Sequence, residues 1–421
     1  MNISFFISQK VFKVQKSAFS TLISRMAVGS IAMGITVVLL SFMIFDGFRS
    51  TIQNKIFSFA AHLQVSKYTL NQSYEEQPIS TERNLFQNIQ KIDANIERGQ
   101  FFSKKPALMR ANEEVLGIVL KGIGTDFDTL RFKKNIEVGK MLSFPAIPNN
   151  TTDSTQAQDT QNLHSQEVVI SRFIADKLEL KIQDKVILYF IQDPPKFRKL
   201  TVSGIYKTDI EDFDKRFVLC DNRLIQGVNS WTDTLAGGYE IFLKDFSKLD
   251  SSSTKMYDAM DYDMQIVSVV DLYLHFFDWF VILNRNIFIF LSIIIFVACF
   301  NVVSILLILI MERTNMIGLL KALGAKQEQI QLIFIYNGWQ ILWKGLVIGN
   351  SLALSIAFLQ DTFKFFKLDA TTYYMDTVPI AWNWTLLIFL NLGIALLTAL
   401  ILWIPVKIIA NISPVKAIRF D

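Results

Sequence analysis

The sequence IMERTNMIGLLKALGA, residues 310–325, separates two long apolar runs, residues 286–311 and 329–360. Its apolar side chains recur at helical spacing and its charges lie among them: Ile317, Leu320 and Leu323, with Glu312, Arg313 and Lys321. A short amphipathic helix between two membrane spans lies at the membrane surface and leaves one face free for a partner. A polar connector that only reverses the chain would have the same geometry, so the residues alone leave both interpretations open.

The composition is that of a membrane protein with one large polar insertion. Of the 421 residues 51% are hydrophobic, and a bilayer span needs about 20 apolar residues. Four runs are long enough. The sequence therefore predicts a membrane α-helical fold of four transmembrane helices, with a large α+β extracytoplasmic domain inserted between helices 1 and 2. We expect an amphipathic N-terminal segment 1–25, helix 1 over 26–48, the outer domain over 49–278, helix 2 over 279–311, a connecting segment 312–328, helix 3 over 329–360, an outer loop 361–376, helix 4 over 377–406 and a tail 407–421.

The charge distribution predicts the orientation. Residues 1–25 contain three lysines and one arginine and no acid, and segments 312–328 and 407–421 are also basic. The positive-inside rule places these parts, and both termini, in the cytoplasm. The first apolar run is longer than the about 7–15 residues of a signal peptide, so we expect an uncleaved anchor.

The outer domain reads as a mixture of strands and helices. Period-two and β-branched runs predict strands at 62–68, 106–111, 115–121, 168–170, 186–191, 200–206, 217–219, 239–243 and 264–269. Apolar residues at helical spacing predict a helix over 81–96, and Ser171 can cap a second one that ends near residue 180.

Motifs for catalysis and metal binding are absent from the sequence. There is no Gly-x-x-x-x-Gly-Lys-Ser/Thr phosphate loop, because Gly139-Lys140 lacks the preceding glycine and the following hydroxyl. There is no Gly-x-Ser-x-Gly or His-Glu-x-x-His, and the three histidines are far apart. Cys220 lies in the outer domain and Cys299 in a span, which argues against a disulfide. We expect no catalytic residue, no metal site and no nucleic-acid binding.

Several phrases of the sequence resemble FtsX-like ABC permeases. Glu-Arg at 312–313 followed by IGLLKALGA at 317–325 resembles the cytoplasmic coupling segment of that family, and ISPVKAIR at 412–419 resembles its C-terminal phrase. Residues 167–186 resemble a phrase of its outer domain, with Glu179 and Gln183 where the family usually has glycine. The resemblance implies an ATPase-coupling role for Glu312, Arg313, Ile317, Leu320, Lys321, Leu323 and Gly324. Gly324 is expected to end the helix in the left-handed conformation.

The chain is most similar to the lipoprotein-releasing permeases. In that family two permease subunits pair as a homodimer or heterodimer, and two ABC ATPase subunits, which bind ATP and Mg, dock beneath them. The resemblance implies a non-catalytic subunit of the bacterial inner membrane, in contact with lipids, that releases lipoprotein cargo to a periplasmic carrier. Three alternatives stay open: a macrolide-efflux-type permease, a permease that regulates cell-wall hydrolases, and a membrane-anchored receptor, which would leave the coupling phrase unexplained.

For two further sites the sequence allows two interpretations each. An outer hairpin either is an ordinary solvated turn or recruits the carrier, and its residues are Pro194, Pro195, Lys196, Phe197 and Arg198. Lys344 is the one ionisable residue well inside a span, where a lysine costs about 2.5–3.5 kcal/mol unless it snorkels or finds a partner. It either reaches the headgroups or contacts Asn337 or Asn301 within the bundle.

Glycines on the first and third spans let helices approach closely. They are Gly29, Gly34, Gly338, Gly345 and Gly349. They serve either packing within one chain, which we favour, or a seam between two subunits.

Overall fold

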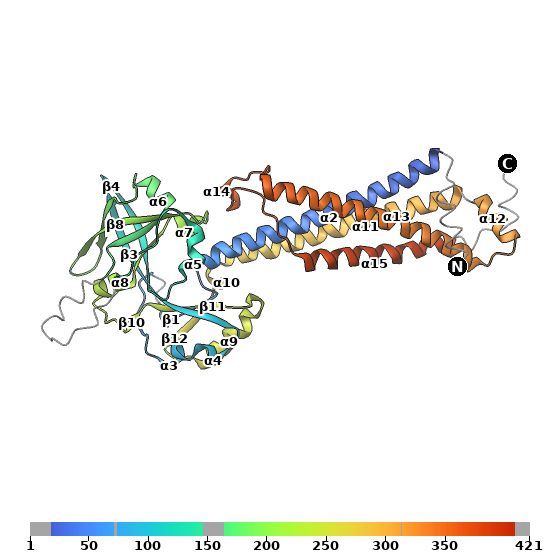
Figure 1. Ribbon diagram of the computed structural model, residues 1–421. Coiled ribbons are helices and arrows are strands. Elements are labelled where there is room, and N and C mark those ends of the chain that lie inside the picture. The colour runs from blue at the N-terminus through green and yellow to red at the C-terminus, as the bar shows by residue number, and fades with distance from the viewer. Residues whose placement is uncertain (1–17, 71–73, 146–163, 313, 409–421) are drawn as a thin grey trace. The chain divides into compact units, whose positions relative to one another are not determined.

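The structure is a computed structural model that describes residues 18–70, 74–145, 164–312 and 314–408 (Figure 1). Most of the N-terminal segment 1–25, Arg313 and nearly all of the tail 407–421 lie outside these ranges. The chain divides into two units. The helical unit comprises Met1–Thr51, Trp279–Leu368 and Thr377–Asp421, and the α+β unit comprises Ile52–Asp278 and Asp369–Asp376.

Long apolar helices make up the helical unit. They are α2 (Ala18–Phe59), α11 (Leu274–Glu312), α13 (Gln327–Phe363) and α15 (Trp384–Ile408), with the short α12 (Thr314–Ala322) between α11 and α13. The end of α2 from Ile52 and the start of α11 up to Asp278 are counted with the α+β unit. Among the described residues, three stretches are long and apolar enough to cross a membrane, Ser24–Phe59, Leu274–Val297 and Gln327–Phe363, and the apolar part of α15, Trp384–Leu400, is shorter. Helix α2 continues past the expected end at residue 48, because residues 48–59 contain no Gly or Pro and their apolar side chains Ile52, Ile56 and Phe59 are buried.

Glycines of α13 bring it close to α2. A Cβ on Gly345 would lie 2.5 Å from Ile31 Cγ2, and one on Gly349 would lie 2.8 Å from the Ala32 carbonyl oxygen. The Thr36 hydroxyl donates a 3.1 Å hydrogen bond to the Gly349 carbonyl. Packing within the chain is therefore confirmed for these two glycines.

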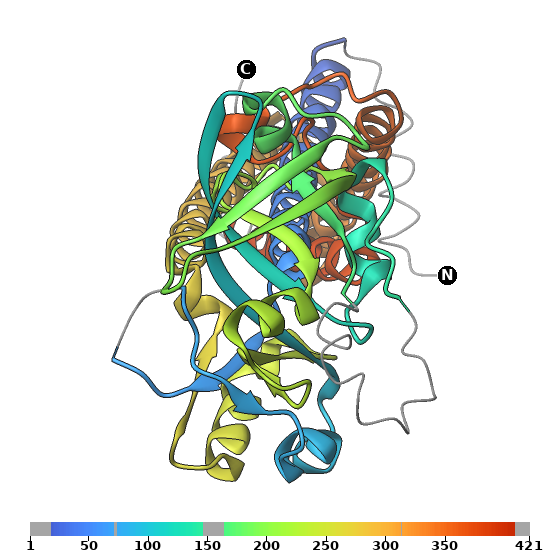
Figure 2. The ribbon, with the colours of Figure 1, turned by 90° about the vertical axis from the view of Figure 1, so that its left-hand side faces the viewer.

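A mixed sheet forms the frame of the α+β unit. In the described ranges it has ten strands in the order β12-β1-β11-β3-β4-β9-β6-β8-β5, and β7 pairs with β3 and β8. Strands of the α+β unit face the viewer in Figure 2. Pairs β4–β9 and β6–β8 are parallel, and the other pairs of this sheet are antiparallel. The strands are β1 (Leu63–Lys67), β3 (Ile96–Ala111), β4 (Glu114–Ile123), β5 (Ile136–Gly139), β6 (Glu167–Ser171), β7 (Lys185–Phe190), β8 (Lys196–Tyr206), β9 (Phe217–Asp221), β11 (Gly238–Leu243) and β12 (Met264–Ser268); β2 (Ile79–Ser80) pairs with β10 (Leu235–Ala236).

Two hydrophobic cores share the long strand β3. Its first part pairs with β11 and its second part with β4 and β7. One core lies among β3, β4 and β6 to β9 under α6 (Arg172–Lys177) and α8 (Asn222–Asn229). The other lies among β1, β11 and β12 with α3 (Asn84–Gln87), α4 (Ile89–Ile92) and α9 (Leu249–Ala259). Shorter helices are α5 (Thr129–Phe132), α7 (Glu211–Asp214), α10 (Val269–Leu272) and α14 (Ala370–Tyr373), with 3₁₀ turns at Lys133–Asn135 and Phe246–Lys248.

The expected strands are found near their predicted positions, but the helix expected over 81–96 is wrong. Two single turns, α3 and α4, replace it, and Ile96 already pairs with Leu243 as the first residue of β3. The Ser171 cap is confirmed, because its hydroxyl accepts a 3.0 Å bond from the Ile174 amide. Glu179 and Gln183 have φ angles of 51° and 75°, the left-handed region that glycine favours.

Candidate functional site

The segment between α11 and α13 folds as the sequence indicates. Helix α12 runs from Thr314 to Ala322, and Gly324 follows it with φ +87°. The Ala325 amide donates to the Leu320 carbonyl at 3.0 Å, which satisfies one of the last carbonyls of the helix. The predicted left-handed end at Gly324 is confirmed.

The apolar side chains of this segment point in two directions, not one. Ile317 is 0% exposed and packs with Ile310, Ile330 and Phe334 of its own chain, and Leu320 is half-buried against the same cluster. Leu323, by contrast, is 76% exposed. The helical spacing of Ile317, Leu320 and Leu323 led us to expect that these side chains share the face that meets a partner, and this expectation is wrong. Steps of three residues drift around a helix of about 3.6 residues per turn, so Leu323 lies about 120° away from Ile317.

The exposed face carries a different leucine pair. Leu319 is 58% exposed and lies four residues before Leu323, so the two share one side of the segment. Glu312 is exposed and Lys321 is half-buried. Sequence reasoning missed Leu319 because it lies between two residues that fit the expected pattern. The exposed apolar side chains of this segment thus include Leu319 and Leu323, with charged residues beside them.

The predicted outer hairpin is the connection between β7 and β8. Lys196 opens β8 opposite Phe190, and its ammonium donates a 2.7 Å bond to the Val228 carbonyl at the end of α8, where a helix favours a cation. Arg198 donates to the Phe197 carbonyl at 2.9 Å. Pro194 and Pro195 are exposed. Lys196 thus fixes the hairpin to α8, whereas the Arg198 bond is local, and Phe197 places an exposed aromatic ring on the hairpin.

This ring continues an apolar row across the sheet. Phe197 pairs with Tyr189, Tyr189 with Leu108, and Leu108 with Gly117, so these residues lie side by side on four strands. Phe197 is 68% and the neighbouring Ile191 is 81% exposed. Large apolar side chains that cluster in the open are typical of a protein-binding surface.

The two polar residues singled out in the third apolar helix have different surroundings. Lys344 is exposed on α13, whereas Asn337 is buried. A contact between two polar side chains of different helices was not predicted. The side-chain amides of Asn350 on α13 and Asn391 on α15 exchange hydrogen bonds of 2.7 and 3.0 Å. Amide pairs of this kind hold helices together where water is excluded.

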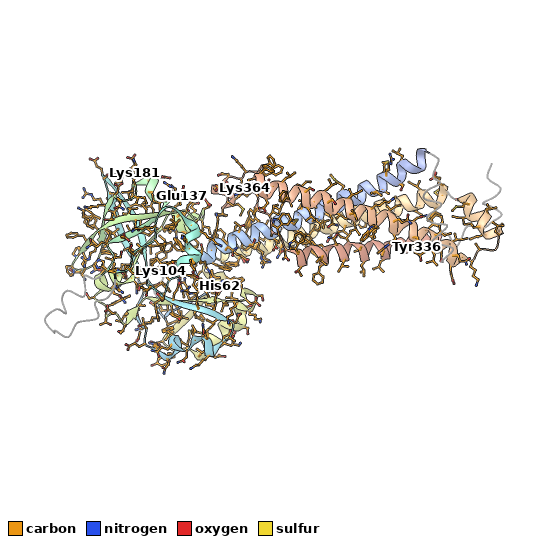
Figure 3. All side chains as sticks on the ribbon, in the orientation of Figure 1. His62, Lys104, Glu137, Lys181, Tyr336 and Lys364 are labelled. Atoms are coloured by element: carbon orange, nitrogen blue, oxygen red, sulfur yellow. The ribbon has the colours of Figure 1, made fainter. Side chains whose placement is uncertain are left out.

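Buried titratable groups occur in the α+β unit, although the described residues contain no group of three His, Cys, Asp or Glu that could hold a metal. His62 precedes β1 (Figure 3), and its Nδ1 accepts a 2.7 Å bond from the Leu243 amide. Burial, with a smaller contribution from Arg131, lowers the pKa of His62 to about 4. The imidazole is therefore neutral near pH 7 and acts as a hydrogen-bond acceptor within the fold.

Two family models match the sequence. The FtsX-like permease C-terminal model matches residues 288–414, and the MacB-like periplasmic core domain model matches residues 24–243. The first therefore covers α12 with the helices that flank it, and the second covers α2 and most of the sheet.

Curated relatives extend over nearly the whole chain. The lipoprotein-releasing system transmembrane protein LolC of Buchnera aphidicola subsp. Schizaphis graminum is 22% identical, over 91% of this chain and 90% of its own. The protein LolE of the same system in Haemophilus influenzae is 22% identical, over 99% of each chain. Among solved structures, the periplasmic region of MacB from Actinobacillus actinomycetemcomitans matches 52% of this chain and 93% of its own, with 12% identity and a TM-score of 0.33.

Proposed function

Because the chain belongs to the FtsX-like permeases with a MacB-like periplasmic core domain, we propose that it is the membrane subunit of an ABC transporter that releases lipoproteins from the bacterial inner membrane. ATP and Mg would be bound by two separate ATPase subunits, and this chain would perform no catalysis. The proposal takes the cargo from the curated relatives, which are named for lipoprotein release and align with almost the full chain.

The observation that carries the proposal is that α12 has one buried and one exposed apolar side. Its inner side is fixed to its own chain through Ile317, while Leu319 and Leu323 are left open at the other side. A short helix held in this way can transmit a push from a partner to α11 and α13, between which it lies. Glu312, Arg313 and Lys321 would form rim ion pairs with the ATPase, each worth only about 0–1 kcal/mol.

A second permease subunit is part of the proposal. Many apolar side chains of α11 remain exposed within this chain, among them Phe288, Phe296 and Phe300. Lipid can cover part of this surface, and a second subunit, identical or not, would cover the rest. We place four spans in the inner membrane, with both termini in the cytoplasm and the α+β unit in the periplasm, because basic residues concentrate at the termini and beside α12.

The apolar row at the β7–β8 hairpin would receive the periplasmic carrier. Phe197 and Tyr189 are the large rings of the row, and Ile191 extends it toward the hairpin tip. Aromatic groups of this size are common at the centre of protein interfaces. Lys196 would position the hairpin and would not touch the carrier, because its ammonium is bonded to α8.

Purification from native membranes followed by reconstitution tests the proposal. We expect an ABC ATPase to copurify, and we expect ATP to drive transfer of a triacylated lipoprotein from proteoliposomes to soluble carrier. Copurification of a cell-wall hydrolase without lipoprotein transfer would instead identify a regulatory permease. ATP-dependent movement of a macrolide without lipoprotein transfer would identify a drug-efflux permease.

A further inference from the structure

The last turns of α2 belong to the α+β unit. Ile52 and Ile56 are fully buried there, and the ring of Phe59 stacks on Phe213 with 4.4 Å between centroids. The Ser58 hydroxyl accepts a 2.7 Å bond from the Asn135 side chain. The end of the first apolar helix is therefore packed as part of the domain core.

A buried ion pair lies at this end of α2. The Lys121 ammonium donates to the Phe59 carbonyl at 2.6 Å and to the Glu240 carboxylate at 2.7 Å, and both side chains are almost fully buried. Burial lowers the pKa of Lys121, and the carboxylate of Glu240 opposes that shift. Breaking a buried pair leaves an uncompensated charge, so this end of α2 cannot loosen at low cost.

Lys55, one turn before that end, contacts two other segments. Its ammonium lies 2.5 Å from an Asp209 carboxylate oxygen, in the connection between β8 and α7, and donates to the Tyr374 carbonyl at 2.8 Å. Lys207 reaches the same carboxylate at 2.7 Å and Asp376 at 3.6 Å. Both partners of the Lys55–Asp209 pair are largely buried, so water screens their attraction less than it does at the surface.

The segment that Lys55 contacts joins two further apolar helices. Asp369–Asp376 belongs to the α+β unit, although the residues on both sides of it, through α13 and α15, belong to the helical unit. Tyr374 also packs its ring on Phe276, in the first turn of α11, at 5.1 Å. Residues continuous with four apolar helices thus converge on the Lys55–Asp209 pair and the segment beside it.

We propose that Lys55 and Asp209 are positioning residues, forming a clasp that makes the end of α2 and the α13–α15 connection move with the α+β unit. The inference rests on the proposed function. In it, displacement of the helices by the ATPases must reach the domain that hands over the lipoprotein. Without the clasp, ATP hydrolysis continues while the connection slips, so the two processes lose their fixed ratio.

The test uses the full chain, assembled with its ATPase and partner permease in proteoliposomes, with a fluorescent triacylated lipoprotein as the probe. Lys55→Met and Asp209→Asn break the pair, and asparagine suits position 209 because its φ is 61°. Lys55→Arg keeps the charge. Lys215→Met is the matched control, because Lys215 pairs with Glu211 on the exposed side of α7.

We expect lipoprotein released per ATP hydrolysed to fall about five-fold or more in Lys55→Met and Asp209→Asn, the lower end of usual coupling factors. Lys207 still pairs with Asp209 in Lys55→Met, and Lys55 still donates to the Tyr374 carbonyl in Asp209→Asn, so neither variant leaves a charge without a partner. ATP turnover and thermal stability should therefore stay at the wild-type level, and Lys55→Arg and Lys215→Met should behave as wild type. An unchanged ratio in Lys55→Met would overturn the clasp. A parallel loss of ATP turnover and stability would also overturn it, because the pair would then serve only the fold.

A second readout separates the clasp from the proposed function. A cysteine introduced by Tyr373→Cys in the clasped segment should change its thiol-labelling rate when ATP is added, and Lys55→Met should abolish that change. If the wild type releases no lipoprotein, the proposed function is wrong, and the labelling result still tests the clasp. An identical ATP response in Lys55→Met would then overturn the clasp by itself.

Discussion

Replacing Gly349 by alanine tests the packing of α2 against α13. The added Cβ would lie 2.8 Å from the Ala32 carbonyl oxygen and 2.9 Å from Ile35 Cβ, where ordinary contacts start at 3.4 Å, so the helices must separate by roughly 0.6 Å (3.4 minus 2.8). Overpacking of this kind costs about 1–3 kcal/mol. The same movement lengthens the contact from the Thr36 hydroxyl to the Gly349 carbonyl, but this adds little to the cost, because the hydroxyl keeps its 2.8 Å bond to the Ala32 carbonyl.

Two other helical glycines serve as controls for that substitution. A Cβ on Gly29 of α2 or Gly393 of α15 would meet nothing within 4 Å in this chain. Alanine in an open helical position is about 0.5–1 kcal/mol more favourable than glycine. Gly29→Ala and Gly393→Ala should therefore leave the protein as stable as the wild type or make it more stable. Gly349→Ala, by contrast, should lower the stability.

Thermal unfolding of the full chain in detergent, followed by tryptophan fluorescence, measures the difference. We expect Gly349→Ala to lower the midpoint by several degrees and Gly393→Ala to leave it unchanged or raise it. Ile35→Ala should not recover the loss in Gly349→Ala, because the Ala32 carbonyl oxygen and the Cβ at position 35, which alanine keeps, still meet the new methyl. Equal midpoints for Gly349→Ala and Gly393→Ala would refute the close contact between α2 and α13.

The remaining predictions concern the coupling segment and the α+β unit. Leu319→Asp with Leu323→Asp should detach the ATPase on purification while the permease still inserts, because burial of an unpaired carboxylate costs several kcal/mol; stoichiometric ATPase in the double variant would contradict this. Ile317→Asp should instead reduce the amount of folded permease, measured by fluorescence size exclusion, because its site lies inside the chain. Glu179→Gly should stabilise by roughly 0.5–1 kcal/mol, because it relieves a left-handed φ, and Glu179→Ala should not, which thermal unfolding can separate. The pKa of His62 is about 4 when folded against 6.5 when unfolded, so the unfolded chain binds the extra proton. Stability should therefore fall as the pH drops from 6.5 to about 4, by about 3 kcal/mol, and His62→Gln should flatten that slope in pH-dependent unfolding.

The positions of most elements could be predicted from the sequence because they rest on local signals. Gly324 ended its helix as expected, and the strands around Val186 and Leu200 follow their apolar alternation. The helix predicted over 81–96 does not form, because its last residue, Ile96, pairs with β11, which lies far along the chain. The spacing of apolar residues within 81–96 gives no information about that partner strand.

The sequence located the segment that forms the candidate site, but it did not predict which of its side chains are exposed. The phrase around α12 located it, yet which leucine faces outward depends on Phe334 and Ile330 of α13, which bury Ile317. The hydrogen-bonded pair Asn350–Asn391 could not be predicted for the same reason. Its formation depends on how α13 and α15 are aligned along each other, which the sequence does not specify.

Strand β1 sets the order in which the α+β unit can mature during biosynthesis. Gln64 in β1 bonds to Glu240 in β11, 176 residues later, and β12 follows only at Met264. The second core therefore stays open until almost the whole unit has left the ribosome, with Leu63 and Val65 of β1 without their partners. A chain stalled before β11 would present β1 and the first part of β3 without this partner strand, which exposes them to chaperones and proteases.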